Sequence, residues 1–293
     1  MGACSSCCCC VAKTVIAVHC LLHLLNLHFT LKEWREARST GTIEELKETL
    51  NDLGSDLSKI PVNELPESLD NAVFICCNTY KKLSYRLGVG PMNDSINVAT
   101  YLHDIGHTVY YLHNPTSDQF IEYLKYFLSH TKKHLTVYYT GHGASIDDVH
   151  GDESDGKDEC MVFEDKFIVD DDLADILAQY KTNPDCKTLL LTDCCHSGSI
   201  WDIQSGNFNG RVLPPNVMSI SAAEDEQTSK QTKIDGTYQG IFTFYFFKLL
   251  LENPNYTPKE LEKDIKPYLN QFEQCYVVAT TSESMLNEPI FSN

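Results

Sequence analysis

The stretch "LLLTDCCHSGS" (189–199) passes from an apolar run to an acid, two cysteines and a histidine. A short apolar run followed by small polar residues is typical of a buried strand that ends at a loop. The stretch "LTVYYTGHG" (135–143) has the same form and places His142 between two glycines. Each stretch therefore predicts a strand whose carboxyl end carries a reactive side chain, His142 in one case and Cys194 or Cys195 in the other.

Similar apolar runs alternate with segments of helical spacing from residue 71 onward. The spacing predicts six strands, over residues 72–77, 107–112, 135–140, 188–192, 216–221 and 276–281. It predicts helices over residues 95–106, 117–130, 171–180, 241–253 and 258–272. This alternation indicates an α/β fold with a mostly parallel sheet flanked by helices on both faces. Functional residues of such sheets gather beyond the carboxyl ends of the strands, so the two reactive stretches should meet there.

Histidine beside cysteine suits nucleophilic catalysis, because the thiolate attacks and an imidazole raises its population. His142 would activate the thiol and later protonate a leaving amine. The backbone N–H groups of Gly143 and Cys195 would stabilise the developing oxyanion. The alternative interpretation is structural: both cysteines are small buried hydrophobes, and His142 is an ordinary loop residue.

The charge of the chain narrows the classes of partner. The 293 residues include 23 basic and 41 acidic side chains, which give a formal charge of -18. Such a surface repels nucleic acid, so we exclude nucleic-acid binding, whereas acidic clusters suit basic substrates or a hard cation. The 13 cysteines show no zinc-type spacing, which indicates free thiols in a reducing, cytoplasmic compartment.

Several short motifs occur in a fixed order along the chain. They are "MNDSINVATYL" (92–102), "YYTGHG" (138–143), "DGKDE" (155–159), "IVDDDL" (168–173), "DCCHSGS" (193–199) and "ISAAEDEQTS" (220–229). This order resembles the metacaspases of type I, a family of caspase-fold cysteine peptidases. The resemblance implies a caspase-like peptidase domain over 69–293, in which 69–205 is large-subunit-like and 212–293 is small-subunit-like. It also implies a six-stranded sheet, and a monomer.

The resemblance assigns a role to each residue of the reactive site. Cys195 would be the nucleophile and His142 its base. Asp94 and Asp193, together with Thr140, would line a pocket for the Arg or Lys that precedes the scissile bond of a protein or peptide substrate. Two carboxylates suit a buried guanidinium, which binds them through paired hydrogen bonds. The alternative for Asp94 is that it caps the helix that follows it.

A second set of acids resembles the family's calcium site and implies Ca2+ as a cofactor. It consists of Asp158, Asp170, Asp171 and Asp202, and the sequence leaves open which two of Asp170, Asp171 and Asp172 bind the ion. Calcium takes six to eight oxygen ligands, and binding would order the loop beside Cys195 as a switch. The alternative is a solvated acidic face. Exposed self-cleavage points are expected at Arg211, Lys230 and Lys233.

The head of the chain predicts a membrane anchor. Gly2 after the initiator methionine fits the pattern for N-myristoylation, and Cys4 is a candidate for palmitoylation. We therefore expect residues 1–13 to form a lipidated, Cys-rich head that associates with a membrane surface. Residues 14–68 are expected to form a helical segment and linker, and their apolar part, 14–29, is short for a membrane span.

Three functions fit these observations. The first is a calcium-activated, self-processing cysteine endopeptidase that cleaves after Arg or Lys through a Cys–His dyad. The second is a membrane-tethered, catalytically weak scaffold with a caspase fold. The third is an asparaginyl peptidase of the legumain type, whose pocket would not need two acids for a cation.

Overall fold

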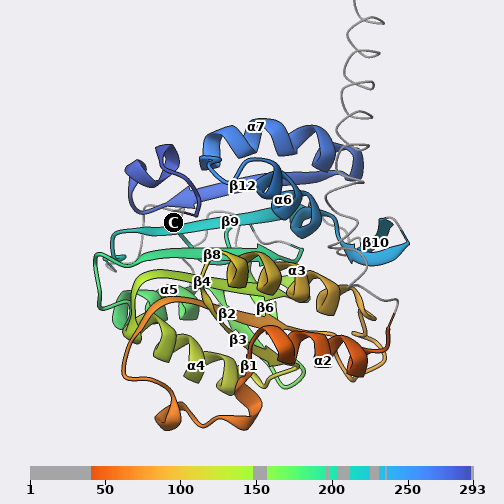
Figure 1. Ribbon diagram of the computed structural model, residues 1–293, viewed down its shortest axis with the longest axis horizontal. Helices are drawn as coiled ribbons and strands as arrows, with labels where there is room; N and C mark the ends of the chain where they lie inside the picture. Colours follow the sequence, from red (N-terminus) through yellow and green to blue (C-terminus); the bar gives the residue numbers. More distant parts are fainter. Residues whose placement is uncertain are drawn as a thin grey trace, which may run out of the picture. The chain divides into compact units, whose positions relative to one another are not determined.

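Seven strands build the central sheet of the computed structural model (Figure 1). In spatial order they are β1 (Ser55–Asp56), β3 (Thr108–His113), β2 (Leu69–Cys77), β4 (Thr131–Thr140), β8 (Lys187–Asp193), β9 (Val217–Glu224) and β12 (Gln274–Thr280). All neighbouring pairs are parallel except β9 and β12. The structure describes residues 41–147, 157–195, 198–203, 212–224, 231–234 and 236–291. These residues, from Thr42 onward, belong to one compact unit.

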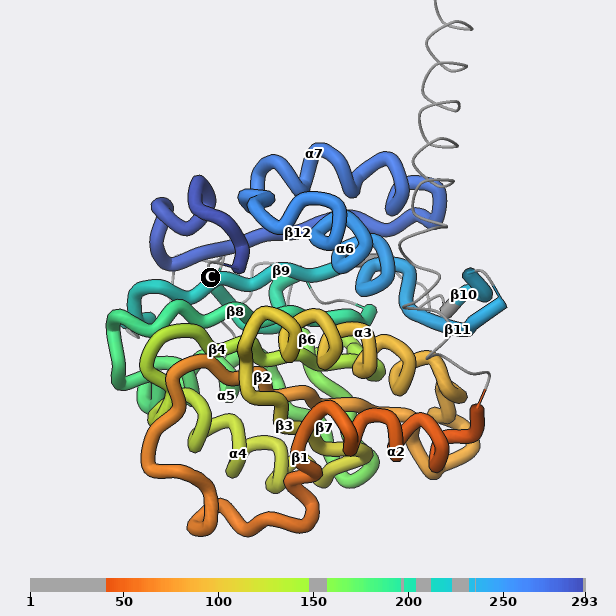
Figure 2. The backbone as a smooth tube through the Cα atoms, in the orientation of Figure 1, coloured from red at the N-terminus to blue at the C-terminus, as the bar shows by residue number. Residues whose placement is uncertain are grey.

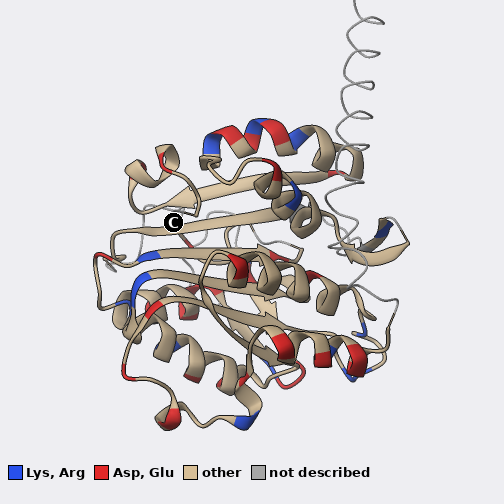
Figure 3. Ribbon diagram, in the orientation of Figure 1, with Lys and Arg blue, Asp and Glu red and all other residues tan. Residues whose placement is uncertain are grey.

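Helices cover both faces of this sheet (Figure 2). One face carries α2 (Ile43–Leu53), α3 (Gly90–Asp104), α6 (Ile241–Glu252) and α7 (Pro258–Leu269). The other face carries α4 (Ser117–His130) and α5 (Asp170–Tyr180). Acidic side chains recur along α2, and both signs of charge alternate along α7 (Figure 3). The charged side chains of α2 and α7 therefore face solvent, while the apolar side chains of these two helices pack in the core.

Smaller elements lie outside the main sheet. Strands β5 (Gly143–Asp147), β6 (Lys157–Val162) and β7 (Phe167–Val169) form an antiparallel sheet, and β10 (Gln231–Ile234) pairs with β11 (Thr237–Gly240). Short 3₁₀ segments are Leu57–Lys59, Val62–Glu64, Asn270–Phe272 and Glu283–Asn287.

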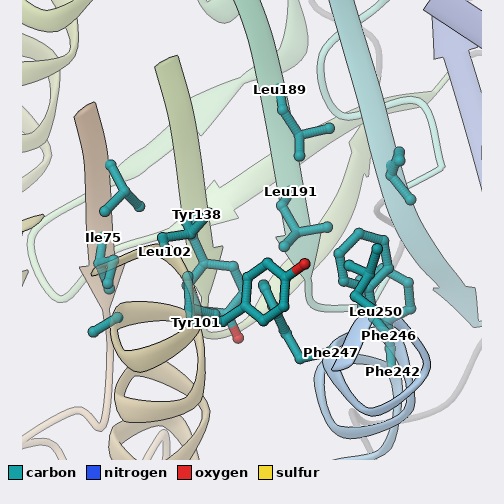
Figure 4. Close-up of a cluster of buried hydrophobic side chains, with 14 of the residues drawn as sticks. Ile75, Tyr101, Leu102, Tyr138, Leu189, Leu191, Phe242, Phe246, Phe247 and Leu250 are labelled. Atoms are coloured by element: carbon teal, nitrogen blue, oxygen red, sulfur yellow. The ribbon is translucent and has the colours of Figure 1, made fainter. Parts of the chain in front are cut away.

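Each central strand divides its side chains between two apolar clusters. In β2, Ile75 packs toward the face of α3 and α6, whereas Phe74 packs toward the face of α4 and α5. Successive side chains of a strand point to opposite faces, so a strand covered on both faces is apolar throughout. Figure 4 shows Ile75 and Leu191 of the strands on the same side as Phe246 and Leu250 of α6.

The predicted α/β fold is confirmed, and each of the six predicted strands corresponds to a strand of the main sheet. The sheet has one further strand, the two-residue β1, which is too short to give an alternating pattern. The predicted helix starts agree with the structure to within one residue, except that of α3. Helix α3 begins at Gly90 rather than at residue 95, with Pro91 in its first turn, where proline costs no hydrogen bond. Helix α4 begins at Ser117, as predicted, and Thr116 caps it.

The predicted helical segment and linker, 14–68, divides at residue 41. Residues 14–40 lie outside the described residues. Helix α2 packs in the same unit as the sheet, with Leu46 and Leu50 in the apolar cluster that contains α3. A capping box between Thr42 and Glu45 fixes where α2 begins.

Two neighbouring leucines of α6 provide a test of this packing. Leu250 is fully buried, whereas Leu251 is 44% exposed. We expect Leu250→Ala to lower the free energy of unfolding by about 2–5 kcal/mol, because it leaves a cavity in the core. Leu251→Ala should cost about 1 kcal/mol or less. Denaturant unfolding of both variants measures the difference, and equal losses would contradict the packing of α6.

Candidate active site

The two predicted reactive stretches meet at one edge of the sheet. Strands β4 and β8 are neighbours, and their last residues, Thr140 and Asp193, are paired in register. The turn that carries His142 follows β4, and the turn that carries Cys195 follows β8. Because both strands are parallel, both turns lie at the carboxyl edge of the sheet, as predicted.

The backbone of Gly143 lies directly against the turn that carries the cysteines. A methyl group built on Gly143 would lie 2.0 Å from the carbonyl oxygen of Cys195 and 2.8 Å from Sγ of Cys194. No side chain fits in that space, so glycine is required by the close approach of two backbones rather than by a special φ. Gly143, the residue after His142, therefore packs against the carbonyl of Cys195.

A backbone carbonyl determines which nitrogen of His142 carries the proton. Nε2 lies 2.8 Å from the carbonyl oxygen of Tyr85. A carbonyl oxygen only accepts hydrogen bonds, so Nε2 must be the protonated nitrogen. In the neutral ring, Nδ1 is therefore the nitrogen with a free lone pair. Burial lowers the pKa of His142 below its ordinary value of 6.5, and the bond to Tyr85 opposes this only in part. The ring is thus a neutral base at pH 7.

Two tyrosines hold the backbone on both sides of this ring. The Tyr80 hydroxyl accepts from the His142 N–H at 2.7 Å and donates to the Val162 carbonyl at 2.8 Å. The Tyr139 hydroxyl donates to the His142 carbonyl at 2.7 Å. A methyl group on Gly141 would lie 2.7 Å from the Tyr80 hydroxyl and 2.9 Å from that of Tyr139. The glycine before His142 is therefore needed so that both hydroxyls can reach the turn.

The two adjacent cysteines differ in their surroundings. Cys194 belongs to the apolar cluster of α4 and α5, together with Ile200 and Trp201. Cys195 is buried but belongs to neither apolar cluster of the described residues. This difference supports Cys195 as the reactive thiol and Cys194 as a packing residue.

The two predicted pocket acids converge on Gly240, at the end of β11. A methyl group on Gly240 would lie 2.3 Å from Oδ2 of Asp193 and 3.0 Å from Oδ2 of Asp94. Asp94 is 1% exposed and Asp193 is 8% exposed. Two carboxylates this close in a buried site repel each other, so a cation between them would be favoured.

The hydrogen bonds of Asp94 exclude the alternative that it caps a helix. It lies inside α3, after the first turn, and both of its carboxylate oxygens accept from the N–H of Gly240, at 2.9 and 2.8 Å. Its neighbours on α3 also reach the small hairpin: Asn93 donates to the carbonyl of Tyr238, and Asn97 lies 3.4 Å from the side chain of Gln239. The polar residues of α3 are thus buried against β11.

Asp193 is held from the start of α6. Its Oδ2 accepts from the N–H of Thr243 at 3.2 Å and from the Thr243 hydroxyl at 2.6 Å. That hydroxyl also lies 2.8 Å from the hydroxyl of Tyr138, whose pKa is raised well above its ordinary value by burial first and then by Asp94 and Asp193. Thr140 is 4% exposed and lies beside Asp193 in the sheet.

The predicted calcium ligands are buried carboxylates from three segments. Asp158 lies in β6, Asp170 and Asp171 begin α5, and Asp202 follows the turn of Cys195; all four are less than 9% exposed. Burial raises the pKa of Asp170 to about 7, and the charges of nearby Glu159 and Asp158 add to the rise. Within the described residues, no three His, Cys, Asp or Glu side chains lie close enough together to hold a metal ion.

The donor chemistry of this set fits calcium. Asp170 accepts from the backbone N–H groups of Glu159 and Asp171, which hold its carboxylate in place. Oxygen ligands with several negative charges are those that Ca2+ prefers, and buried repulsion is what such a cation would relieve. The four side chains would have to converge further to share one ion.

Several predicted residues lie outside the described part of the chain: Gly2, Cys4, Arg211 and Lys230. Of the predicted self-cleavage points, only Lys233 is described. It is exposed in β10, opposite Tyr238. Within the described ranges, no helix has the length and apolar character needed to cross a bilayer.

Sequence reasoning missed the residues that hold the site together. Tyr80, Tyr85, Gly240 and Thr243 contribute through hydrogen bonds or close contacts between distant segments. Tyr85 acts through its carbonyl, so its side chain carries no signal. Asn93 and Asn97 of α3 are a usable signal in the sequence, because buried amides on a helix need hydrogen-bond partners from another segment.

Comparisons with known proteins agree with this geometry. A family model described as "Caspase domain" matches residues 70–287. Metacaspase-1 of Yarrowia lipolytica is 26% identical over 194 residues, which cover 46% of this chain and 42% of that protein. Metacaspase-2 of Trypanosoma brucei brucei is 29% identical over 190 residues, covering 56% of this chain and 52% of the relative. The chain thus spans about half the length of these relatives.

Solved structures share the fold. The crystal structure of caspase-1 from Spodoptera frugiperda matches with a TM-score of 0.53 at 12% identity, covering 74% of this chain and 90% of that chain. At this identity the likeness concerns the fold alone.

The protonation of His142 can be measured without any assay of activity. With ¹⁵N-labelled histidine, NMR should identify the neutral ring of His142 as the Nε2–H tautomer. Its midpoint should lie below pH 6.5, because burial favours the neutral form. The His142→Gln variant assigns the signal. An Nδ1–H tautomer, or a midpoint above 6.5, would contradict the geometry at Tyr85.

Proposed function

Because the chain belongs to the caspase domain family, we propose that it is a cysteine endopeptidase that cleaves after Arg or Lys through Cys195 and His142. The observation that carries this proposal is the contact of Gly143 with the Cys195 carbonyl, which brings the turn of His142 against the turn of Cys195. Nε2 of His142 is bound to the Tyr85 carbonyl, so Nδ1 is the ring nitrogen that can accept a proton.

The reaction follows from these two side chains. Nδ1 of His142 takes the proton of the Cys195 thiol, and the thiolate attacks the carbonyl carbon of the scissile peptide bond. The backbone N–H groups of Gly143 and Cys195 stabilise the oxyanion that forms. The imidazolium then gives its proton to the leaving amine. Water, deprotonated by the same ring, hydrolyses the thioester and restores the free thiol.

The paired carboxylates favour a cationic side chain before the scissile bond. Asp94 and Asp193 converge on Gly240 and are held there by neutral donors of Gly240 and Thr243. A guanidinium or ammonium would neutralise both charges, and a guanidinium can bind each carboxylate through two hydrogen bonds. An asparaginyl peptidase would have no use for two buried acids, so this arrangement favours Arg or Lys over Asn.

Calcium activation is part of the proposal. Asp158, Asp170, Asp171 and Asp202 would hold the ion, since they are buried, whereas Asp172 of the same run is exposed. Bound calcium would supply the positive charge that relieves the repulsion among these carboxylates. Because Asp202 lies on the segment after Cys195, binding would order the turn that carries the nucleophile.

The proposal also includes self-cleavage and attachment to a membrane. Self-cleavage is proposed at Arg211, Lys230 or Lys233. Acylation of Gly2 and Cys4 would tether a monomeric, cytoplasmic enzyme to a membrane surface. The alternative function is a membrane-tethered scaffold with weak catalysis, and the experiment below separates the two.

Fluorogenic peptides that end in Arg, Lys, Asn or Asp test the proposal, with and without calcium. We expect turnover after Arg and Lys only, and Cys195→Ala should lower kcat at least about 10³-fold because it removes the nucleophile. Asp193→Asn should lower kcat/KM for the Arg peptide by about 30-fold or more, since it halves the charge of the pocket. Mass spectrometry of the same incubations detects self-cleavage.

Cys194→Ala is the matched control and should keep most of the activity, because Cys194 packs in the apolar cluster. Turnover of none of the peptides in any condition would favour the scaffold. Cleavage after Asn would favour the asparaginyl peptidase.

Terbium, which substitutes for calcium, tests the metal site independently of catalysis. Trp201 is buried next to Asp202 and should sensitise the luminescence of terbium bound there. Excess calcium should remove the signal. Asp170→Asn should weaken terbium binding at least about tenfold, whereas Asp172→Asn, at the exposed position, should change it little. Equal effects of both variants would argue for a solvated acidic face. Trp201→Phe, which removes the sensitising indole, is the control for the luminescence.

A further inference from the structure

A basic loop lies beside the candidate base. The stretch "KKLSYR" (81–86) carries three cations and no acid, in a chain whose formal charge is -18. Lys81, Lys82 and Arg86 are all exposed. Among the described residues, none of these three cations forms an ion pair. The loop also exposes Leu83, whose side chain is 80% exposed.

One of these cations contacts Tyr85, the residue whose carbonyl binds His142. The ammonium of Lys82 lies 4.6 Å from the ring centroid of Tyr85. Tyr85 binds Nε2 of His142 through its carbonyl, and the centroids of the two rings are 6.1 Å apart. The cation–π contact orders a side chain that would otherwise be flexible and leaves the exposed side of the ammonium available to a carboxylate.

The loop is fixed to the rest of the molecule. The Glu164 carboxylate accepts from the backbone N–H groups of Lys81 and Lys82, and the Leu87 N–H donates to the Thr79 carbonyl at 3.1 Å. Glu164 therefore binds the backbone of the loop rather than its ammonium groups. These bonds hold the backbone of the loop, and with it the starting points of its three cationic side chains, in place beside Tyr85.

The direction of the proposed reaction decides which part of a substrate meets this loop. His142 protonates the leaving amine, so the chain after the scissile bond must pass next to it. The residue before the scissile bond points to Asp94 and Asp193, which contact Gly240 and Thr243 instead. The pocket acids and the basic loop therefore meet opposite sides of the scissile bond.

We propose that this loop, through Lys82 with Lys81 and Arg86, binds an acidic side chain of the substrate segment that follows the scissile bond. The inference rests on the proposed function and adds a second charge requirement to it: a cation before the cut and an anion after it. Exposed ion pairs of this kind are weak and sensitive to salt, so the effect is a preference of about two- to fivefold at low ionic strength.

Two internally quenched peptides provide the test. They have the same sequence up to an Arg and differ only in the two residues that follow it, Glu-Glu or Gln-Gln. We expect kcat/KM to be about two- to fivefold higher for the Glu peptide at about 20 mM salt and nearly equal at about 500 mM. The double variant Lys82→Gln/Arg86→Gln should bring the ratio close to one at low salt. Lys263→Gln, which removes an exposed cation from α7, should keep the ratio of the wild type.

A third substrate separates failure of this inference from failure of the proposed function. An Arg-coumarin amide has no residue after the scissile bond, so it reports cleavage after Arg alone. Turnover of this amide together with equal rates for the two peptides, or with a preference that the double variant retains, would overturn the role of the loop. If the wild-type protein cleaves none of the three substrates, the proposed function is overturned and this inference with it.

Discussion

The close contact between Gly143 and the carbonyl of Cys195 is the constraint on which the site depends. It exists because β4 and β8 are neighbours that end level with each other, at Thr140 and Asp193. A hydrogen atom is the only side chain that this contact admits. The hydroxyls of Tyr80 and Tyr139 then bind the backbone of the turn, and the imidazole is oriented by the Tyr85 carbonyl and by the ring of Tyr80.

Buried negative charge surrounds this contact. Asp94 and Asp193 are buried side by side, and Asp158 and Asp170 belong to a second buried acidic set. Burying carboxylates is costly unless a cation or several hydrogen bonds compensate for it. Backbone N–H groups and the Thr243 hydroxyl hold Asp94, Asp170 and Asp193 in place, and the two cation sites proposed for these acids stay proposals. The basic loop near Tyr85 is the opposite case, an exposed set of cations in an acidic chain.

The strands and the meeting of the two turns that follow β4 and β8 could be predicted from the sequence, because strands buried on both faces are apolar throughout and parallel strands share a carboxyl edge. The start of α3 could not, since Gly90 and Pro91 resemble a loop and the polar face of α3 is buried rather than solvated. The role of Tyr85 had no signal at all, because it acts through a carbonyl that every residue possesses. Acylation of the head and the calcium ligands stay predictions.

The pairing of β8 with β9 has a consequence for the integrity of the molecule. These strands lie side by side in the sheet, although they are separated in the sequence by the connection between Asp193 and Val217. Gly240 and Thr243, from the later part, donate hydrogen bonds to Asp94 and Asp193, from the earlier part. A chain severed between the two strands would therefore still migrate as a single particle, held by a shared sheet and core, and would come apart into two polypeptides only when it is denatured.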